Sequence, residues 1–120
     1  MGLFTLDEAR AELARLRPII DEVIGLRADM VELSAALTPG GRPTDLGGMP
    51  ERKATEARLD ELMTTIQETG AELKGVAPLL LDFPADLDGE PILLCWVEGE
   101  TVLEWYHRAD LGFAGRRRLP

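Results

Sequence analysis

Residues 79–100, LLLDFPADLDGEPILLCWVEGE, decide the fold of this chain. Apolar residues dominate this stretch, and the pairs Asp88-Gly89 and Glu98-Gly99 interrupt them. An Asp-Gly pair between apolar segments is typical of a two-residue β-hairpin turn. A third apolar segment follows the second turn. The pattern therefore predicts a three-stranded antiparallel β-meander with strands at 79–83, 91–97 and 101–107.

The two turns also predict which side chains share a face of the sheet, because register follows loop length and side chains alternate along a strand. The predicted core face, which should pack on helices, carries Leu79, Leu81, Phe83, Ile92, Leu94, Trp96, Leu103, Trp105 and His107. The predicted second face carries Leu80, Asp82, Leu93, Cys95, Val97, Val102, Glu104 and Tyr106. This second face is too apolar for water, so we expect another segment to cover part of it.

The N-terminal part of the chain has the periodicity of a long helix. Thr5-Leu6-Asp7-Glu8 fits the capping box, in which Thr5 and Glu8 each accept a hydrogen bond from the other's backbone amide. Apolar residues then recur every three or four positions as far as Leu37. Pro18 lies inside this stripe, but the stripe keeps its phase, so we expect a kinked and unbroken helix.

A loop separates this helix from a second one. Residues 38–50 contain four glycines and three prolines without any period, which is typical of a mobile connector, and they lack the ending of a phosphate-binding loop. Pro50 suits the first turn of a helix whose apolar stripe extends to Leu73, with Gly75 placed to end it. The predicted fold class is α+β: an antiparallel helical hairpin at about 5–75, the meander at about 79–107 and an ordered C-terminal tail at 108–120.

Composition limits the classes of function. A chain of 120 residues fits a single domain, residues 1–120, and 45% hydrophobic residues exclude a disordered chain. A net charge of -9 opposes nucleic-acid binding, and the short basic run Arg116-Arg117-Arg118 does not reverse that. There is no export signal and no apolar segment long enough to cross a membrane, so we expect a cytoplasmic protein with neither membrane nor nucleic acid as partner. The single cysteine, Cys95, is predicted to be a buried structural thiol.

The length of the first predicted helix raises the question of assembly. A helix from Leu6 to Leu37 would be about 48 Å long, whereas a compact domain of this size has a diameter of about 35 Å. We therefore expect the helices to overhang the sheet and to bury their exposed stripe in a homodimer or against another protein's helices. The alternative is a strong bend at Pro18 that folds the helix over the sheet within a monomer.

The segment 105–116 concentrates unusual residues, including the only histidine and the only tyrosine of the chain. Together with residues 4–9 (FTLDEA), 81–85 (LDFPA), the Asp88-Gly89 turn and 94–96 (LCW), the strings WYH and GFAGR resemble an uncharacterised bacterial family, the domain of unknown function two-two-zero-three. The resemblance covers almost the whole chain. It implies a small cytoplasmic bacterial protein with a helical part and a short sheet, and it carries over no catalytic residue.

The candidate site therefore depends on the chemistry of its own residues, which are Trp105, His107, Asp110, Gly112, Phe113, Gly115 and Arg116. In one interpretation they form a structural clasp: His107 bonds Asp110 and pins the tail, the two glycines let the chain turn, and Phe113 plugs an apolar gap. In the other they line a pocket in which Arg116 binds a carboxylate or phosphate.

These alternatives give two functional hypotheses. The first is a homodimeric protein-interaction or structural module, with another protein as a possible partner. The second is a small-molecule-binding or metal-binding protein, with an enzyme as a further alternative, that uses a patch of His107, Asp110 and Arg116. With one histidine and one cysteine we assign no metal ligands and no cofactor, although a carboxylate-rich site could use Asp82 or Asp110. No nucleophile is paired with His107, so no catalytic residue is assigned.

Overall fold

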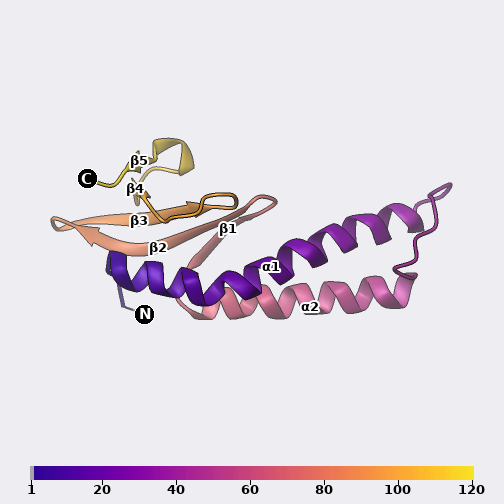
Figure 1. Ribbon diagram of the computed structural model, residues 1–120. Helices are drawn as coiled ribbons and strands as arrows, with labels where there is room; N and C mark the ends of the chain where they lie inside the picture. The colour runs from indigo at the N-terminus through magenta and orange to yellow at the C-terminus, as the bar shows by residue number, and fades with distance from the viewer. Residues whose placement is uncertain (1) are drawn as a thin grey trace. The chain divides into compact units, whose positions relative to one another are not determined.

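The computed structural model describes residues 2–120 and confirms the predicted α+β class, with a helical hairpin followed by an antiparallel sheet (Figure 1). The chain divides into two compact units. One unit contains the chain up to Leu16 and Ile66–Pro120, and the other is Arg17–Thr65. The sheet and the first turns of the first helix belong to the former, and most of the helical hairpin belongs to the latter.

Helix α1 spans Leu6–Leu37, as predicted, and continues through Pro18. The capping box at its start is confirmed: the Thr5 amide donates to Glu8 Oε1 over 2.8 Å, and the Glu8 amide donates to Thr5 Oγ1 over 3.1 Å. Because both side chains satisfy backbone amides that have no partner inside the helix, the local sequence alone fixes where α1 begins.

Helix α2 spans Met49–Glu68 and has Pro50 in its first turn, as predicted. Within the unit Arg17–Thr65 it runs antiparallel to α1 (Figure 1). Arg58 of α2 forms a bidentate ion pair with Glu22 of α1, with N to O distances of 2.8 and 3.0 Å. Nearer the connecting loop, Arg52 Nε donates to Ser34 Oγ. The buried apolar side chains of this unit are Ile20, Val23, Leu33 and Leu62.

The prediction that α2 continues to Gly75 is wrong. The helix ends at Glu68, and Gly70 takes a left-handed conformation with φ of 97°, which glycine adopts without steric cost. Leu73, assigned to the helical stripe, instead pairs with Leu81 in an additional strand, β1 (Glu72–Val76). The apolar period alone did not distinguish Gly70 from Gly75 as the end of the helix.

The sheet has five antiparallel strands in the order β1-β2-β3-β4-β5, two more than predicted. The further strands are β2 (Leu79–Leu87), β3 (Glu90–Val97), β4 (Trp105–Arg108) and β5 (Arg117–Arg118). The predicted two-residue turn between β2 and β3 is confirmed, since Asp88 and Gly89 both have positive φ, 53° and 85°. Two successive positive φ values are what a hairpin turn of this type requires.

The predicted two-residue turn between β3 and β4 is wrong. The chain turns at Glu98-Gly99, where the Glu100 amide donates to the carbonyl of Val97, but it then leaves the ladder until Trp105. In this excursion Leu103 becomes buried, and its carbonyl accepts a hydrogen bond from Arg10 Nε of α1. Burial of Leu103 therefore competes with continued strand pairing.

This longer connection changes the face on which β4 presents its side chains. Tyr106 pairs with Leu94 and His107 pairs with Leu93, so Tyr106 shares the core face while His107 lies on the second face. The predicted placement of Trp105 and His107 on the core face is therefore wrong. A register shift of one residue moves every side chain of a strand to the opposite face.

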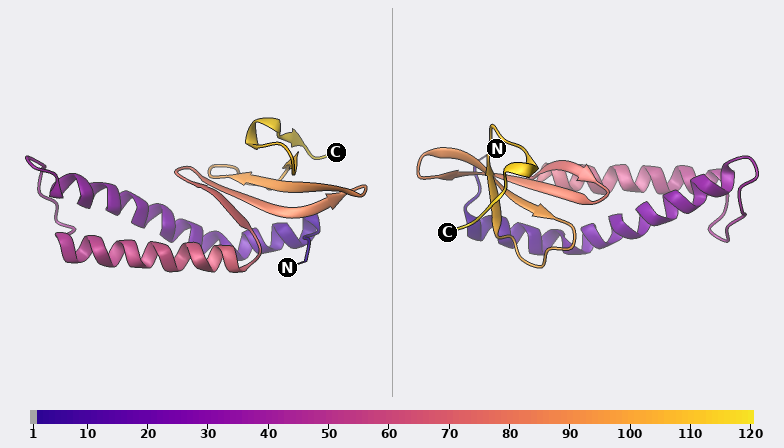
Figure 2. Two further views of the ribbon diagram at one scale, coloured as in Figure 1. Left: turned by 180° about the vertical axis from the view of Figure 1, so that it is seen from behind. Right: turned by 90° about the horizontal axis from the view of Figure 1, so that it is seen from above.

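The first turns of α1 pack against the core face of the sheet (Figure 2). The amide of Phe4 donates to the carbonyl of Pro84, and the Phe4 ring meets that of Phe83 edge to face at 5.2 Å. The C-terminal segment, residues 109–120 after β4, lies on the opposite side of β2 and β3 and includes a short 3-10 helix η1 (Phe113–Gly115). The buried side chains on the core face of β2 and β3 are Leu79, Leu81, Phe83, Ala85, Ile92, Leu94 and Trp96.

No helix in residues 2–120 is long and apolar enough to cross a membrane.

Substitution at the β2–β3 turn tests the backbone requirement of this hairpin. Because Gly89 has φ of 85°, Gly89→Ala is expected to lower the free energy of unfolding by about 1 kcal/mol. Gly25→Ala is the matched control: Gly25 lies inside α1, and an added Cβ meets nothing within 4 Å. It should raise that free energy by about 0.5 kcal/mol. Urea unfolding measures both, and an equal effect of the two substitutions would contradict the turn assignment.

Candidate functional site

Three side chains of different chemistry meet on the second face of the sheet. Asp82 of β2 pairs directly with Cys95 of β3, and His107 of β4 pairs with Leu93, two residues before Cys95. The alternation of the strands therefore places all three on one face. Their carboxylate, thiol and imidazole atoms lie within 4.8 Å of one another. We call Asp82, Cys95 and His107 the acid–thiol–imidazole cluster.

The cluster is buried although it contains ionisable groups. Among residues 2–120, Asp82 and His107 are the buried polar or charged side chains, with 1% and 2% of their surface exposed. Burying ionisable groups costs several kcal/mol unless partners compensate them. His107 Nε2 lies 3.2 Å from Asp82 Oδ2, so each group compensates the other. The other carboxylate oxygen, Asp82 Oδ1, is buried and has no hydrogen-bond partner among the described residues.

Both ring nitrogens of His107 face acceptors. Nδ1 lies 2.9 Å from the carbonyl oxygen of Arg108, and a carbonyl can only accept, so Nδ1 carries a proton and donates. Nε2 faces the Asp82 carboxylate. Neither nitrogen is left over for a substrate. In this arrangement His107 cannot serve as a general base unless its contact with Asp82 is broken.

Lys74 brings a positive charge to the rim of the cluster. The pairing of β1 with β2 shifts between Leu73 and Gly75, so Lys74 occupies a β-bulge. Its Nζ lies 3.1 Å from Asp82 Oδ2 and 3.2 Å from Glu72 Oε1. Partial burial opposes the charge on Lys74, but the hydrogen bonds to Asp82 and Glu72 outweigh it and hold the pKa above its ordinary value. A bulge that re-aims a side chain in this way is common next to functional sites.

Cys95 is fully buried, as predicted for the single thiol. Burial, together with the neighbouring Asp82 carboxylate, raises the pKa of the Cys95 thiol to about 12. At neutral pH the sulfur therefore stays protonated and is not a nucleophile.

A pocket of about 200 Å³ opens above Asp82 and His107. Lys74 stands at its rim, and the remaining lining side chains are mostly apolar. The C-terminal segment supplies one wall of the pocket, and β2 and β3 supply the other. The full lining is Lys74, Leu80, Asp82, Leu93, His107, Ala109, Leu111, Gly112 and Phe113. A concave, mostly apolar space with a few converging polar groups is the usual form of a small-ligand site.

The residues predicted as one candidate site fall into separate groups. His107, Gly112 and Phe113 line the pocket. Arg116 does not reach it: its guanidinium lies 4.7 Å from the ring centres of both Trp105 and Phe113, and it forms an ion pair with Glu100. This stack fixes the C-terminal segment against β4. Arg116 is therefore already paired with a carboxylate of the chain itself.

The predicted hydrogen bond between His107 and Asp110 is absent from the described residues, since His107 bonds Asp82. Asp110 is exposed and pairs with Arg108, whose hydrogen bond lowers the pKa of that carboxyl. The two glycines of the tail also differ. An added Cβ on Gly115 would lie 3.0 Å from Leu111 Cβ, whereas one on Gly112 would meet nothing within 4 Å. A close approach therefore explains Gly115 but not Gly112.

The candidate site predicted from the sequence lacked Lys74 and Cys95, and it included Asp82 only as a possible metal ligand. Asp82 had a recognisable signal, because it is the one charged residue inside the apolar segment 79–83. Cys95 could have been associated with it from their direct pairing across the Asp88-Gly89 turn. His107 could not have been associated with Asp82 from the sequence, because the face on which it lies depends on the length of the connection between β3 and β4 at 98–104.

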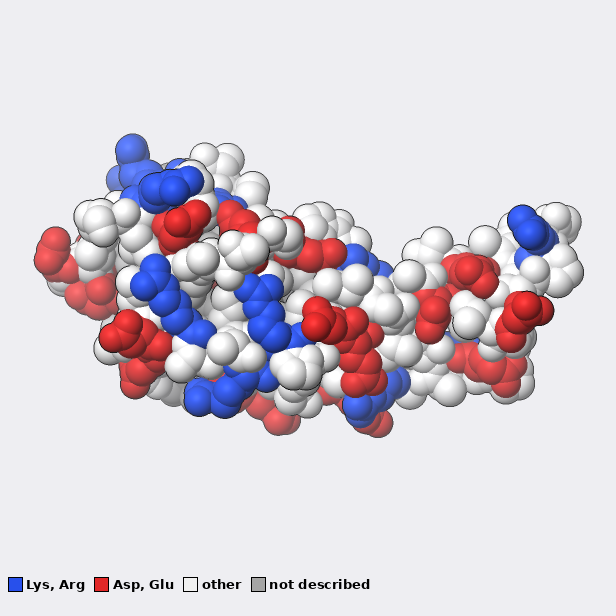
Figure 3. All heavy atoms as spheres, viewed as in Figure 1, with Lys and Arg blue, Asp and Glu red and all other residues white. Residues whose placement is uncertain are grey.

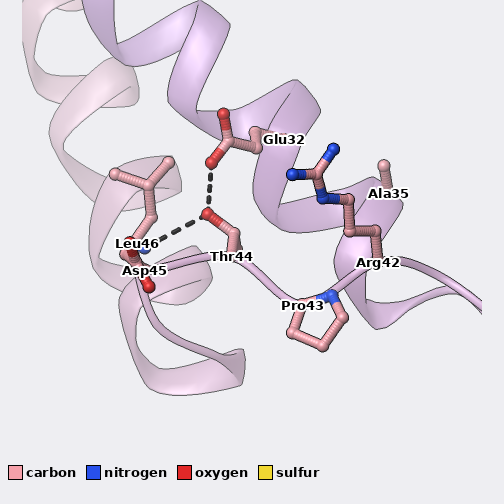
Figure 4. A pocket seen from close by; sticks show the side chains of 7 residues that line it. All are labelled: Glu32, Ala35, Arg42, Pro43, Thr44, Asp45 and Leu46. Atoms are coloured by element: carbon pink, nitrogen blue, oxygen red, sulfur yellow. Dashed lines mark hydrogen bonds between the residues drawn. The ribbon is translucent and has the colours of Figure 1, made fainter.

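A larger pocket, of about 630 Å³, lies at the loop that joins α1 and α2 (Figure 4). Its lining comes from the end of α1 and from residues 42–46. Thr44 Oγ1 donates to Glu32 and accepts from the amide of Leu46, so the polar groups at its centre are engaged with one another. These side chains are largely exposed, which makes the pocket a weaker candidate than the acid–thiol–imidazole cluster.

Charge on the surface is mixed. On the face drawn in Figure 3, acidic and basic side chains are interspersed. The arginine run at the C-terminus is partly neutralised, because Arg116 pairs with Glu100 and Arg118 Nη1 lies 3.5 Å from Glu104 Oε2.

The fold and the cluster define a small α+β protein that encloses a carboxylate, a thiol and an imidazole beneath its C-terminal segment. The chain belongs to the family described as "Uncharacterized conserved protein (DUF2203)", whose sequence profile matches residues 2–119. The resemblance noted from the sequence is thereby confirmed. No curated protein and no solved structure matches the chain.

A double-mutant cycle tests the mutual compensation of Asp82 and His107. Asp82→Ala or His107→Ala leaves the other group buried with fewer partners, and each should lower the free energy of unfolding by about 3 kcal/mol. The double variant should be more stable than the sum predicts, by about 1 kcal/mol or more. Glu90→Ala, which removes an exposed partner of Arg108, should cost less than about 0.5 kcal/mol. Strict additivity in urea unfolding would show that the pair does not interact.

Proposed function

We propose that this protein binds a small ligand in the pocket above Asp82 and His107. The observation that carries the proposal is that two ionisable side chains are buried together at the base of this pocket, with a lysine at its rim. A buried pair of ionisable side chains is weak as a source of stability, so the position of Asp82 and His107 beneath a pocket favours a functional role.

The lining of the pocket indicates the kind of ligand. A volume of about 200 Å³ is below the range usual for drug-sized molecules, so the ligand is small. Leu80, Leu93, Leu111 and Phe113 suit an apolar body, and Lys74 suits one polar head group such as a carboxylate. The protein is thus a binding protein for small amphipathic molecules. We place it in the cytoplasm of a bacterium, in keeping with its family resemblance and with a single thiol that needs no oxidising compartment.

Nuclear magnetic resonance of the imidazole tests this proposal, because His107 is the only histidine. A library of short-chain carboxylic acids, amines and alcohols is expected to contain members that shift the His107 ring signals at millimolar concentration. Ala109→Phe, which introduces a ring into the pocket wall, should abolish the shift. Ala114→Phe, a substitution in the same tail outside the lining, should preserve it. A library that leaves the His107 signals unchanged would overturn the proposal.

A second proposal concerns self-association through the unit Arg17–Thr65. Four large apolar side chains of this unit are exposed, namely Val31 at 68%, Leu37 at 41%, Leu46 at 38% and Met49 at 47%. Charges of both signs accompany them along both helices. A two-fold interface sets one surface of the hairpin against its own copy, and a surface with both signs of charge can complement itself. We therefore propose a second copy of this chain as the partner of the hairpin.

Light scattering coupled to size-exclusion chromatography tests the dimer. The wild-type chain should have about twice its mass of 13.2 kDa at micromolar concentration, and Val31→Glu should shift it toward the monomer. Val31 is exposed, so this substitution spares the fold. Ala57→Glu on α2 is the matched control and should leave the mass unchanged. A wild-type monomer throughout the micromolar range would overturn the dimer.

A further inference from the structure

We propose that Asp82, Cys95 and His107 bind one divalent transition metal ion of the zinc class. The inference rests on the proposed binding function in one respect only. The pocket of that function is what leaves one coordination position of the ion open. Four features of the cluster carry it.

The first feature is the donor set. A carboxylate oxygen, a thiolate sulfur and an imidazole nitrogen are the three ligand types of protein zinc sites, whereas magnesium and calcium prefer oxygen alone. Ligand atoms around tetrahedral zinc lie roughly 3.3–3.6 Å apart, given metal–ligand bonds of about 2.0–2.3 Å. The three donors already lie within 4.8 Å of one another, so side-chain movements of about 1 Å would complete the site.

The second feature is the unpartnered oxygen. Asp82 Oδ1 is buried and has no hydrogen-bond partner among the described residues, although the rest of the side chain is well bonded. A buried acceptor without a donor is rare in native proteins and indicates an ion or water that occupies the position. A metal ion beside Cys95 and His107 supplies the missing partner.

The third feature is the orientation of the imidazole. Because Nδ1 donates to the carbonyl of Arg108, Nε2 is the nitrogen directed at Asp82. A ligating histidine in metalloproteins usually donates its other ring N–H to a carbonyl or carboxylate, which fixes the ring and its tautomer. In the metal-bound state the Nε2 lone pair binds the ion, in place of the proton that Nε2 shares with Asp82.

The fourth feature is the charge balance. A dication together with the Asp82 carboxylate, a Cys95 thiolate and a neutral His107 has no net charge, which suits a buried site. Binding releases two protons to solvent, the thiol proton of Cys95 and the proton that lies between His107 Nε2 and Asp82 Oδ2, because the thiolate, the carboxylate and the Nε2 lone pair are the ligands. Lys74 competes with the ion for Asp82, but 44% of its side chain is exposed and it can turn outward to keep its bond to Glu72.

Asp82 and His107 both line the pocket, so a fourth ligand can approach the ion from that side. Three protein ligands and one open position is the arrangement of zinc sites that bind water or small molecules. The apolar pocket then restricts which molecules reach the ion.

Cobalt spectroscopy tests the site on the whole chain. After treatment with a chelator and a phosphine reductant, the protein is titrated with Co²⁺. We expect one equivalent to bind with a Kd of about 1 µM or tighter, with the intense visible bands of tetrahedral cobalt and a thiolate-to-cobalt charge-transfer band. Since the chain has a single cysteine, that band reports on Cys95 alone. Zn²⁺ should displace the cobalt.

Variants separate ligation from loss of fold. Cys95→Ala should abolish the charge-transfer band, and Asp82→Asn or His107→Gln should weaken binding at least about 100-fold. Asp110→Asn, the matched exposed acid of the tail, should bind as the wild type does. Lys74→Gln removes the competing cation and should tighten binding several-fold, an effect that a misfolded variant cannot produce.

The outcomes of the two experiments are independent. The absence of a thiolate band in the wild-type protein at millimolar Co²⁺, or a band that survives Cys95→Ala, overturns the metal site. Small acids that shift the His107 signals in chelator-treated protein would preserve the ligand pocket in that case. A cobalt site in a protein that binds none of those molecules would preserve the metal inference and remove the small-ligand proposal.

Discussion

The register of β4 against β3 is the constraint on which the chemistry of this molecule depends. His107 pairs with Leu93 and so lies on the same face as Asp82 and Cys95. With a register shifted by one residue, Tyr106 would take its place, and Asp82 would be buried opposite a phenol instead of an imidazole. The seven residues between β3 and β4 therefore do more than connect two strands, because they place an imidazole beside a buried carboxylate.

Two anchors hold that register in place. Trp96 Nε1 and the amide of Val97 donate to the backbone carbonyl and the side chain of Glu100, respectively, which closes the turn after β3. Farther along, Leu103 is buried and its carbonyl accepts from Arg10. The first contact is local, and the second joins residues far apart in the sequence. The position of His107 thus depends on a contact between the beginning of the chain and the end of the connection.

The difference between local contacts and contacts far apart in the sequence explains which features could be predicted from the sequence. The capping box at Thr5, the Asp88-Gly89 turn and the presence of a glycine-rich loop between the two helices depend on neighbouring residues, and these features were predicted correctly. The end of α2 was misplaced because Leu73 fits both a helical stripe and a strand, and only its pairing with Leu81 decides between them. The face of His107 was misplaced because nothing local shows that Leu103 leaves the ladder. The candidate site was therefore predicted in part, with its histidine and phenylalanine but without Lys74 and Cys95.

The C-terminal segment is attached to the strand that carries His107, so the wall of the pocket and its base are connected. Tyr106 of β4 pairs with Arg117 of β5, and the guanidinium of Arg116 is held between Trp105 and Phe113. His107 lies between these attachments, and the carbonyl that fixes its imidazole belongs to Arg108, where the segment departs from β4. A displacement of the segment would therefore alter the access to the pocket and the orientation of the imidazole together. Arg116, which is stacked between Trp105 and Phe113, also forms an ion pair with Glu100. The side chain of Glu100 accepts from the Val97 amide and so stabilises the turn after β3. The same residue therefore supports both the register of β4 and the position of the C-terminal segment.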